Sequence, residues 1–86
     1  MPEICRFYGI VIKMFFEEHN PPHFHAEYAD SEALIEIENL GVIAGSLPPR
    51  ALGLVMEWTS LHRQELLLLW QDAQNQNPLH KIAPLK

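Results

Sequence analysis

Cysteine and basic residues are both scarce in this chain. Its 86 residues include one cysteine, Cys5, and six lysine and arginine residues against eleven aspartate and glutamate residues. A single thiol cannot form an internal disulfide, so we expect a reducing compartment and a packed, unreactive Cys5. The formal charge of −5 argues against direct, non-specific nucleic-acid binding, which needs a surplus of cations to neutralise phosphates.

Long apolar runs and several common site motifs are also missing. The longest uninterrupted apolar run, from Leu66 to Trp70, is far too short to span a bilayer. No charged-then-apolar signal segment opens the chain. There is no Gly-rich phosphate loop, nucleophile elbow or paired-cysteine metal motif. These absences predict a cytoplasmic protein with no membrane association.

What the chain does have is apolar content for one core. Apolar residues make up 48% of it, and a chain of this length has room for one core and no second. We therefore predict a single α+β domain over residues 1–86, ending in a tail over 78–86. So small a core gains stability from pairing with another chain, which favours an oligomer.

Residue alternation predicts an antiparallel sheet of about four strands. The first is expected over residues 6–16, where aromatic and β-branched residues dominate. Pro21 and Pro22 then end the ladder pairing and turn the chain. The second and third strands, over 23–28 and 33–38, alternate apolar and polar residues. A short fourth strand is expected over 42–45.

The predicted loop over residues 29–32 sets the register of the second and third strands. Four loop residues would place His25 opposite Glu36 and His23 opposite Glu38. The apolar side chains of both strands would then share the other face, which is why we predict this register.

The last third of the chain predicts one long C-terminal helix over about 50–75, packed on one face of the sheet. His62 and Arg63 interrupt its apolar stripe, so a kinked helix or two shorter helices is the alternative. A second apolar set lies off the stripe. It is either a partner surface or, for its tryptophan, part of the core beneath the tail. The set consists of Leu54, Trp58, Leu61 and Leu68.

The segment His19-Asn20-Pro21-Pro22-His23-Phe24-His25 holds three of the five histidines, directly after Glu17 and Glu18. Imidazoles and carboxylates are common ligands of zinc and similar divalent metals, and an open coordination position activates water for hydrolysis. Plain cross-strand His–Glu hydrogen bonds are the alternative. The predicted ligands are His19, His23, His25, Glu36 and Glu38.

Three stretches together resemble a small bacterial family known as domain of unknown function 4160. They are residues 2–12, the histidine segment 19–25 and residues 61–66. The resemblance implies a short cytoplasmic bacterial protein, with the segment 19–25 as its signature. It also implies a second small gene beside its own, an arrangement similar to toxin–antitoxin pairs.

Two classes of function follow. The first is an interaction protein: a homo-oligomer, or one half of a toxin–antitoxin-like pair with a small partner encoded nearby. Apolar residues cover more of the helix circumference than one sheet can bury, and the core is small. Both observations favour an interaction protein. The second is a metal-dependent hydrolase or nuclease that uses His19, His23 and His25 with Glu36 or Glu38.

Overall fold

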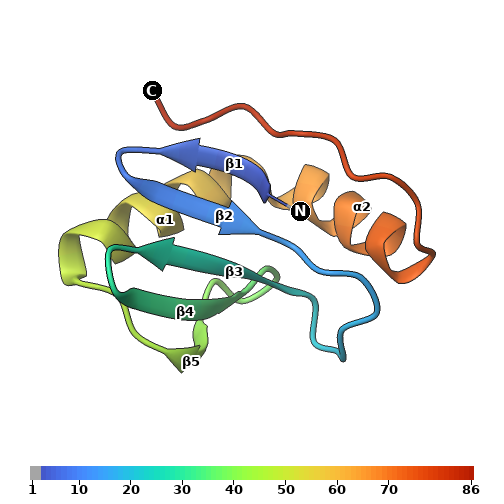
Figure 1. Cartoon of the computed structure of the whole chain (residues 1–86), viewed down its shortest axis with the longest axis horizontal. Coiled ribbons are helices and arrows are strands. Elements are labelled where there is room, and N and C mark those ends of the chain that lie inside the picture. The colour runs from blue at the N-terminus through green and yellow to red at the C-terminus, as the bar shows by residue number, and fades with distance from the viewer. Residues whose placement is uncertain (1–2) are drawn as a thin grey trace.

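An antiparallel sheet occupies the first half of the chain, and two helices follow it (Figure 1). The computed structural model describes residues 3–86. The strands pair in sequence order, which makes the sheet a simple meander. The predicted α+β class is confirmed. The elements are β1 Glu3–Phe7, β2 Ile10–Lys13, β3 His23–Tyr28, β4 Ser31–Glu36, β5 Val42–Gly45, α1 Pro49–Leu61 and α2 Arg63–Gln74.

The predicted first strand over 6–16 is wrong, because the chain reverses within it. β1 and β2 form a hairpin whose two turn residues, Tyr8 and Gly9, have φ values of 50° and 80°. A two-residue hairpin turn with positive φ at both positions matches the right-handed twist of the strands it joins. Apolar residues on both sides of the turn hid this reversal from the sequence pattern. Because the chain reverses there, the sheet has five strands rather than about four.

The predicted register of β3 and β4 is wrong by two residues. The connecting turn has two residues, Ala29 and Asp30, and Tyr28 pairs with Ser31. Side chains alternate across a strand with a period of two, so this shift leaves the apolar side chains on the buried face. It changes only which residues lie opposite one another.

The shift gives the histidines of β3 new neighbours. His23 lies opposite Glu36 rather than Glu38, and His25 lies opposite Leu34 rather than Glu36. The cross-strand pairing predicted for His25 is therefore absent.

The core fills the space between one face of the sheet and the helices. The predicted single helix is divided at His62, where φ is −122° and ψ is 21°, so the alternative of two shorter helices is confirmed. No helix within residues 3–86 is both long enough and apolar enough to cross a membrane. The largest fully buried side chains include Ile10, Ile12, Met14, Phe24, Ile35, Ile37, Val55, Trp58, Leu66 and Leu69.

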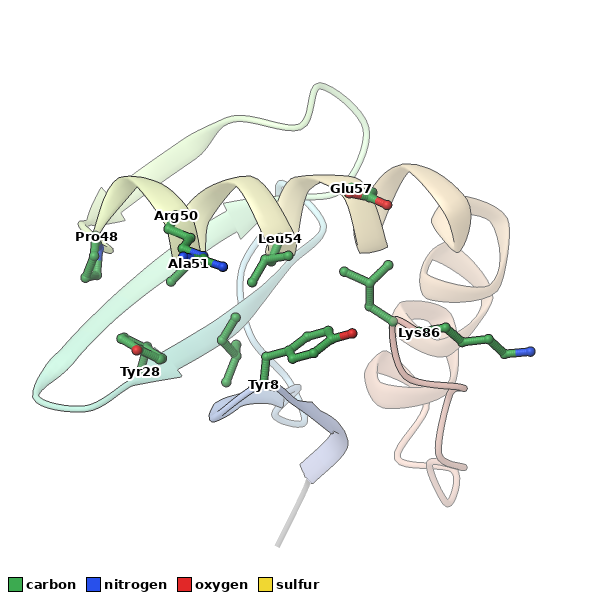
Figure 2. A pocket seen from close by; sticks show the side chains of 10 residues that line it. Tyr8, Tyr28, Pro48, Arg50, Ala51, Leu54, Glu57 and Lys86 are labelled. Atoms are coloured by element: carbon green, nitrogen blue, oxygen red, sulfur yellow. The ribbon is translucent and has the colours of Figure 1, made fainter.

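The tail after α2 runs back along β1 (Figure 1). The Ile82 backbone amide donates a 2.8 Å hydrogen bond to the Ile4 carbonyl, which covers the outer edge of β1. The indole Nε1–H of Trp58 donates to the Ala83 carbonyl at 2.8 Å. Farther along, Leu85 and Lys86 reach a pocket that runs along α1 from Pro48 to Glu57 (Figure 2).

Cys5 lies within this core and is only 3% exposed. Burial raises the pKa of its thiol, which keeps it protonated near neutral pH. We expect iodoacetamide to alkylate Cys5 at least about tenfold more slowly in the native protein than in urea. Mass spectrometry of timed samples measures both rates, and equal rates would contradict the buried placement.

Candidate functional site

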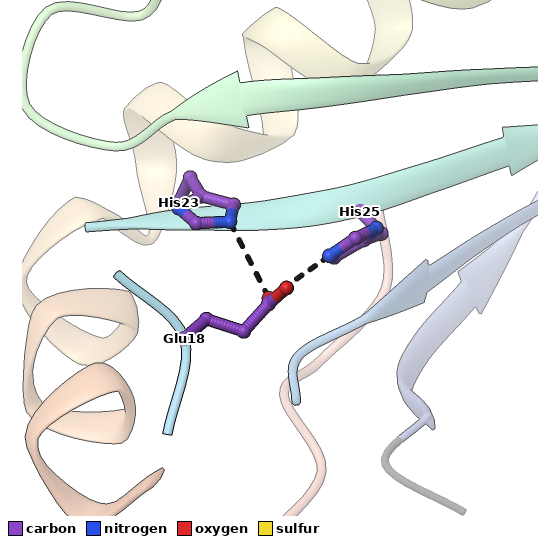
Figure 3. Close-up of side chains that lie close together, drawn as sticks. All are labelled: Glu18, His23 and His25. Carbon is purple, nitrogen blue, oxygen red and sulfur yellow. Dashed lines mark hydrogen bonds and ion pairs between the residues drawn. The ribbon is translucent and has the colours of Figure 1, made fainter. Parts of the chain in front are cut away.

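Two histidines of β3 and one glutamate of the preceding loop converge at one end of the sheet (Figure 3). The Nε2 atom of His25 lies 2.9 Å from Oε1 of Glu18, and Nε2 of His23 lies 3.3 Å from the same oxygen. His23 is buried, whereas His25 and Glu18 are partly exposed. We call Glu18, His23 and His25 the triad.

Nδ1 of each histidine of the triad, the ring nitrogen that faces away from Glu18, makes a hydrogen bond of its own. Nδ1 of His23 lies 2.8 Å from the Pro21 carbonyl oxygen. Nδ1 of His25 lies 3.0 Å from Oε2 of Glu32, the second residue of β4. A carbonyl oxygen can only accept, so Nδ1 of His23 must be the donor. A carboxylate oxygen assigns the same role to Nδ1 of His25.

With both Nδ1 atoms protonated, the two Nε2 atoms face one carboxylate oxygen of Glu18. A ring that carries a second proton donates from Nε2 to Glu18. When both rings are neutral, both Nε2 lone pairs can instead bind a shared cation beside the carboxylate. With both rings neutral, the hydrogen bonds from Nδ1 of His23 to Pro21 and from Nδ1 of His25 to Glu32 are kept. Metal-binding histidines commonly donate their other N–H to a carboxylate or a backbone carbonyl in this way.

The spacing of the three ligand atoms suits a transition-metal ion. The candidate ligand atoms of the triad all lie within 4.8 Å of one another. A tetrahedral zinc ion with bonds of about 2.0–2.2 Å keeps its ligand atoms about 3.4 Å apart. The Nε2–Oε1 distances of 2.9 and 3.3 Å are close to that value. These two distances are therefore compatible with ligation of one shared ion.

Glu18 is positioned beside the two histidines by a hydrogen bond from the end of α2 and by the backbone conformation of its own loop. The side-chain amide of Gln74, at the end of α2, donates a 2.8 Å hydrogen bond to the Glu18 carbonyl. The preceding Glu17 has a φ of 59°, which turns the backbone sharply before Glu18. The Asn20–Pro21 peptide bond in the same loop is cis. The hydrogen bond from Gln74 thus ties the loop that supplies the carboxylate to the end of α2.

Two aromatic rings orient the imidazoles. Trp70 of α2 lies against His23 with ring centroids 5.2 Å apart, and Phe15 meets His25 edge to face at 4.7 Å. Close ring packing restricts both imidazoles to a narrow range of rotamers. Together with the Nδ1 hydrogen bonds, it fixes where the two Nε2 atoms point.

A glycine on β5 keeps Glu32 in position. Gly45 has a φ of 74°, and a Cβ atom there would lie only 2.2 Å from the Glu32 carbonyl oxygen. The next residue, Ser46, donates its amide to that carbonyl at 3.1 Å. Only glycine allows this close approach, which anchors the strand that carries the outer partner of His25.

The structure brings together two of the five predicted metal ligands, His23 and His25. His19 is exposed and lies outside the triad. The Glu36 carboxylate accepts instead from the Asn39 side-chain amide at 3.1 Å, and Glu38 is exposed on the following turn. The two-residue shift of β4 places Glu36 opposite His23 instead of His25 and leaves Glu38 beyond the end of the strand.

The residues of the predicted partner surface also differ in where the structure places them. Trp58 is fully buried and packs on Phe7 and Phe24, so its place on a surface is wrong. Leu61 and Leu68 are 66% and 62% exposed, and Leu54 is partly buried. Their contact with a partner stays a prediction.

Sequence reasoning missed two acids, Glu18 and Glu32. Glu18 immediately precedes the histidine segment, and the two prolines that follow return the chain toward it. That return was the available signal for Glu18. Glu32 carried none, because it was expected in a loop.

One of three comparisons with known proteins gave a match. Curated proteins and solved structures gave no match. A family match covers residues 9–71, which is most of the chain and includes the whole triad. The chain therefore belongs to the family described as "Domain of unknown function (DUF4160)".

Proposed function

We propose that this protein binds one divalent transition-metal ion through Nε2 of His23, Nε2 of His25 and the carboxylate of Glu18. The observation that carries the proposal is the convergence of two Nε2 atoms on one carboxylate oxygen while both Nδ1 atoms are held by acceptors. Two imidazoles and one carboxylate suit zinc and similar ions better than magnesium or calcium.

Isothermal titration of zinc into metal-stripped protein, purified without a histidine tag, tests the proposal. We expect one equivalent to bind. At a hundredfold excess over the dissociation constant, the ion would stabilise the fold by about 2.7 kcal/mol. This corresponds to a rise in melting temperature on the order of 10 °C for a domain of this size. No binding and no thermal shift with zinc, cobalt, nickel or manganese would reject the proposal.

The chemistry open to such a centre is hydrolysis. Three protein ligands leave a coordination position free on a tetrahedral ion, and water held there becomes a nucleophile near neutral pH. Chromogenic carboxylic and phosphate esters test this with the zinc-loaded protein. A hydrolysis rate that disappears in metal-stripped protein supports a hydrolase. A rate equal to that of free zinc leaves metal binding as the function of the triad.

A second proposal, that the protein is also an interaction module, rests on the open edge of the sheet. The tail covers the edge of β1, whereas β5 forms the other edge with Val42 and Ile43 41% and 45% exposed. β5 has neither the charge nor the proline that usually protects an edge strand. We propose that a second copy pairs with it. In a toxin–antitoxin-like module, the small protein encoded nearby would take that place.

Replacing Ile43 by lysine tests whether a second copy pairs with β5. Light scattering after size exclusion at micromolar concentration is expected to give a dimer for the native protein and a monomer for Ile43→Lys. The lysine places a charge where the added strand would lie, and a lysine in place of Phe16, which is 48% exposed and lies outside β5, serves as the control. A native protein that is monomeric would reject the proposal that two copies pair through β5.

A further inference from the structure

A pocket lies at the opposite end of the sheet from the triad. It is enclosed by the turn after β1, the end of β3, the first turns of α1 and the tail (Figure 2), with a volume of about 450 Å³. Tyr28 ends β3 and His23 begins it. At about 3.4 Å per residue, the two sites lie about 17 Å apart. The pocket is thus separate from the proposed metal site.

The pocket combines an apolar floor with a polar rim. Ile10 and Ala51 are buried at its base, and Leu54 and Leu85 line its sides. Pockets of about 300–1,000 Å³ with apolar walls and a few polar groups are typical of small-molecule sites. The rim is formed by Tyr8, Tyr28, Arg50, Glu57 and Lys86.

The charge of the rim indicates what kind of molecule fits. Three of the six basic residues are paired: Arg6 and Lys81 with Glu3, and Lys13 with Glu27. The other three, Arg50, Arg63 and Lys86, form no ion pair with any residue between 3 and 86, although the chain has a formal charge of −5. Arg63 lies outside the pocket, whereas Arg50 and Lys86 both line it. An anion there would supply the partner that the protein does not.

The position of Arg50 adds to this preference. Arg50 is the second residue of α1, whose first turn contains no acidic residue and no side-chain cap. A cation in the first turn is unfavourable, because the helix dipole already makes that end positive. A bound carboxylate would offset both charges, while its apolar part would cover Leu54 and Leu85.

We propose that this pocket binds a small amphipathic carboxylate, with its head group at Arg50 and its apolar body against Ile10, Leu54 and Leu85. Figure 2 shows Arg50 and Tyr8 on two sides of the pocket. A guanidinium forms strong, charge-assisted hydrogen bonds with a carboxylate, so Arg50 selects for the head group. Glu57, also on the rim, works against the anion.

Titration of the metal-stripped protein with octanoate tests the proposal by two-dimensional NMR. Removing metal prevents the carboxylate from binding at the triad. We expect saturable shifts at Tyr8, Tyr28, Ala51 and Leu54, and weaker binding of octan-1-ol. Shifts elsewhere, equal affinity for the alcohol, or no shifts at millimolar octanoate would overturn the proposal.

Three variants sharpen the test. Arg50→Gln is expected to weaken octanoate binding about tenfold or more, because a charge-assisted hydrogen bond is lost. Glu57→Gln should strengthen binding by removing a like charge. Arg63→Gln is the matched control, since Arg63 is an exposed arginine of α2 that does not line this pocket. Unchanged affinity in Arg50→Gln, or an equal loss in Arg63→Gln, would contradict the role of Arg50.

Discussion

Alanine in place of His25 is expected to lower zinc affinity by about 100-fold or more. The change removes one of three ligand atoms and also releases Glu32 from its hydrogen bond. Glu32→Ala should cost less, about 10–100-fold, because Glu32 only orients the ring. Isothermal titration calorimetry on metal-stripped proteins measures the zinc affinity of the native protein, His25→Ala and Glu32→Ala.

Two matched variants control for general effects on the histidine segment. His19→Ala removes a nearby histidine, and Glu38→Gln removes an acid; both residues lie outside the triad. Neither change should alter zinc affinity. A loss in His19→Ala as large as that in His25→Ala would show that the metal is held by the segment as an exposed histidine cluster rather than by the triad.

Alanine in place of Trp58 is expected to lower the free energy of unfolding by about 3–5 kcal/mol, the usual loss for a buried tryptophan. Trp58 is fully buried, packs on Phe7 and Phe24, and donates to the Ala83 carbonyl. The change would leave a cavity and release the tail. Urea unfolding followed by circular dichroism measures the loss.

Two further variants separate the packing of Trp58 from its hydrogen bond. Trp58→Phe keeps an aromatic ring but loses the hydrogen bond and part of the buried volume, so it should cost about 1–3 kcal/mol, less than Trp58→Ala. Leu61→Ala removes an apolar residue of the same helix that is 66% exposed, and should change stability by no more than about 0.5 kcal/mol. A loss below about 1 kcal/mol in Trp58→Ala would contradict its central place in the core.

Residue alternation was enough to predict which faces of β3 and β4 are buried, and it could not determine their register. A shift of two residues leaves every side chain on the same face. The predicted four-residue loop and the observed Ala29–Asp30 turn therefore satisfy the same apolar pattern. What distinguishes them is the φ of 52° at Ala29, which the sequence does not reveal because alanine seldom adopts it.

The hairpin at Tyr8 and Gly9 was missed for a related reason. Apolar residues continue through the turn from β1 into β2, so no polar segment marks the reversal. Gly9 was the one available signal, and its positive φ shows why glycine is there. The helix boundary at His62 was easier, because His62 and Arg63 interrupt the apolar stripe.

The sequence pattern could place His23 and His25 together because they belong to one strand. His23 and His25 are two residues apart, which places them on the same face whatever the register. Glu18 depends on the path of the loop, and that path is set by a distant contact with Gln74. Contacts between residues so far apart in sequence lie outside the reach of local patterns.

Long-range proton–nitrogen NMR of the imidazole rings, recorded with and without one equivalent of zinc, tests the central claim most directly. We expect both His23 and His25 to keep the proton on Nδ1 and to show Nε2 bound to the metal in the zinc-loaded protein. Zinc that leaves the Nε2 resonances of both rings unchanged, or that binds through Nδ1 of either ring, would contradict the proposed centre.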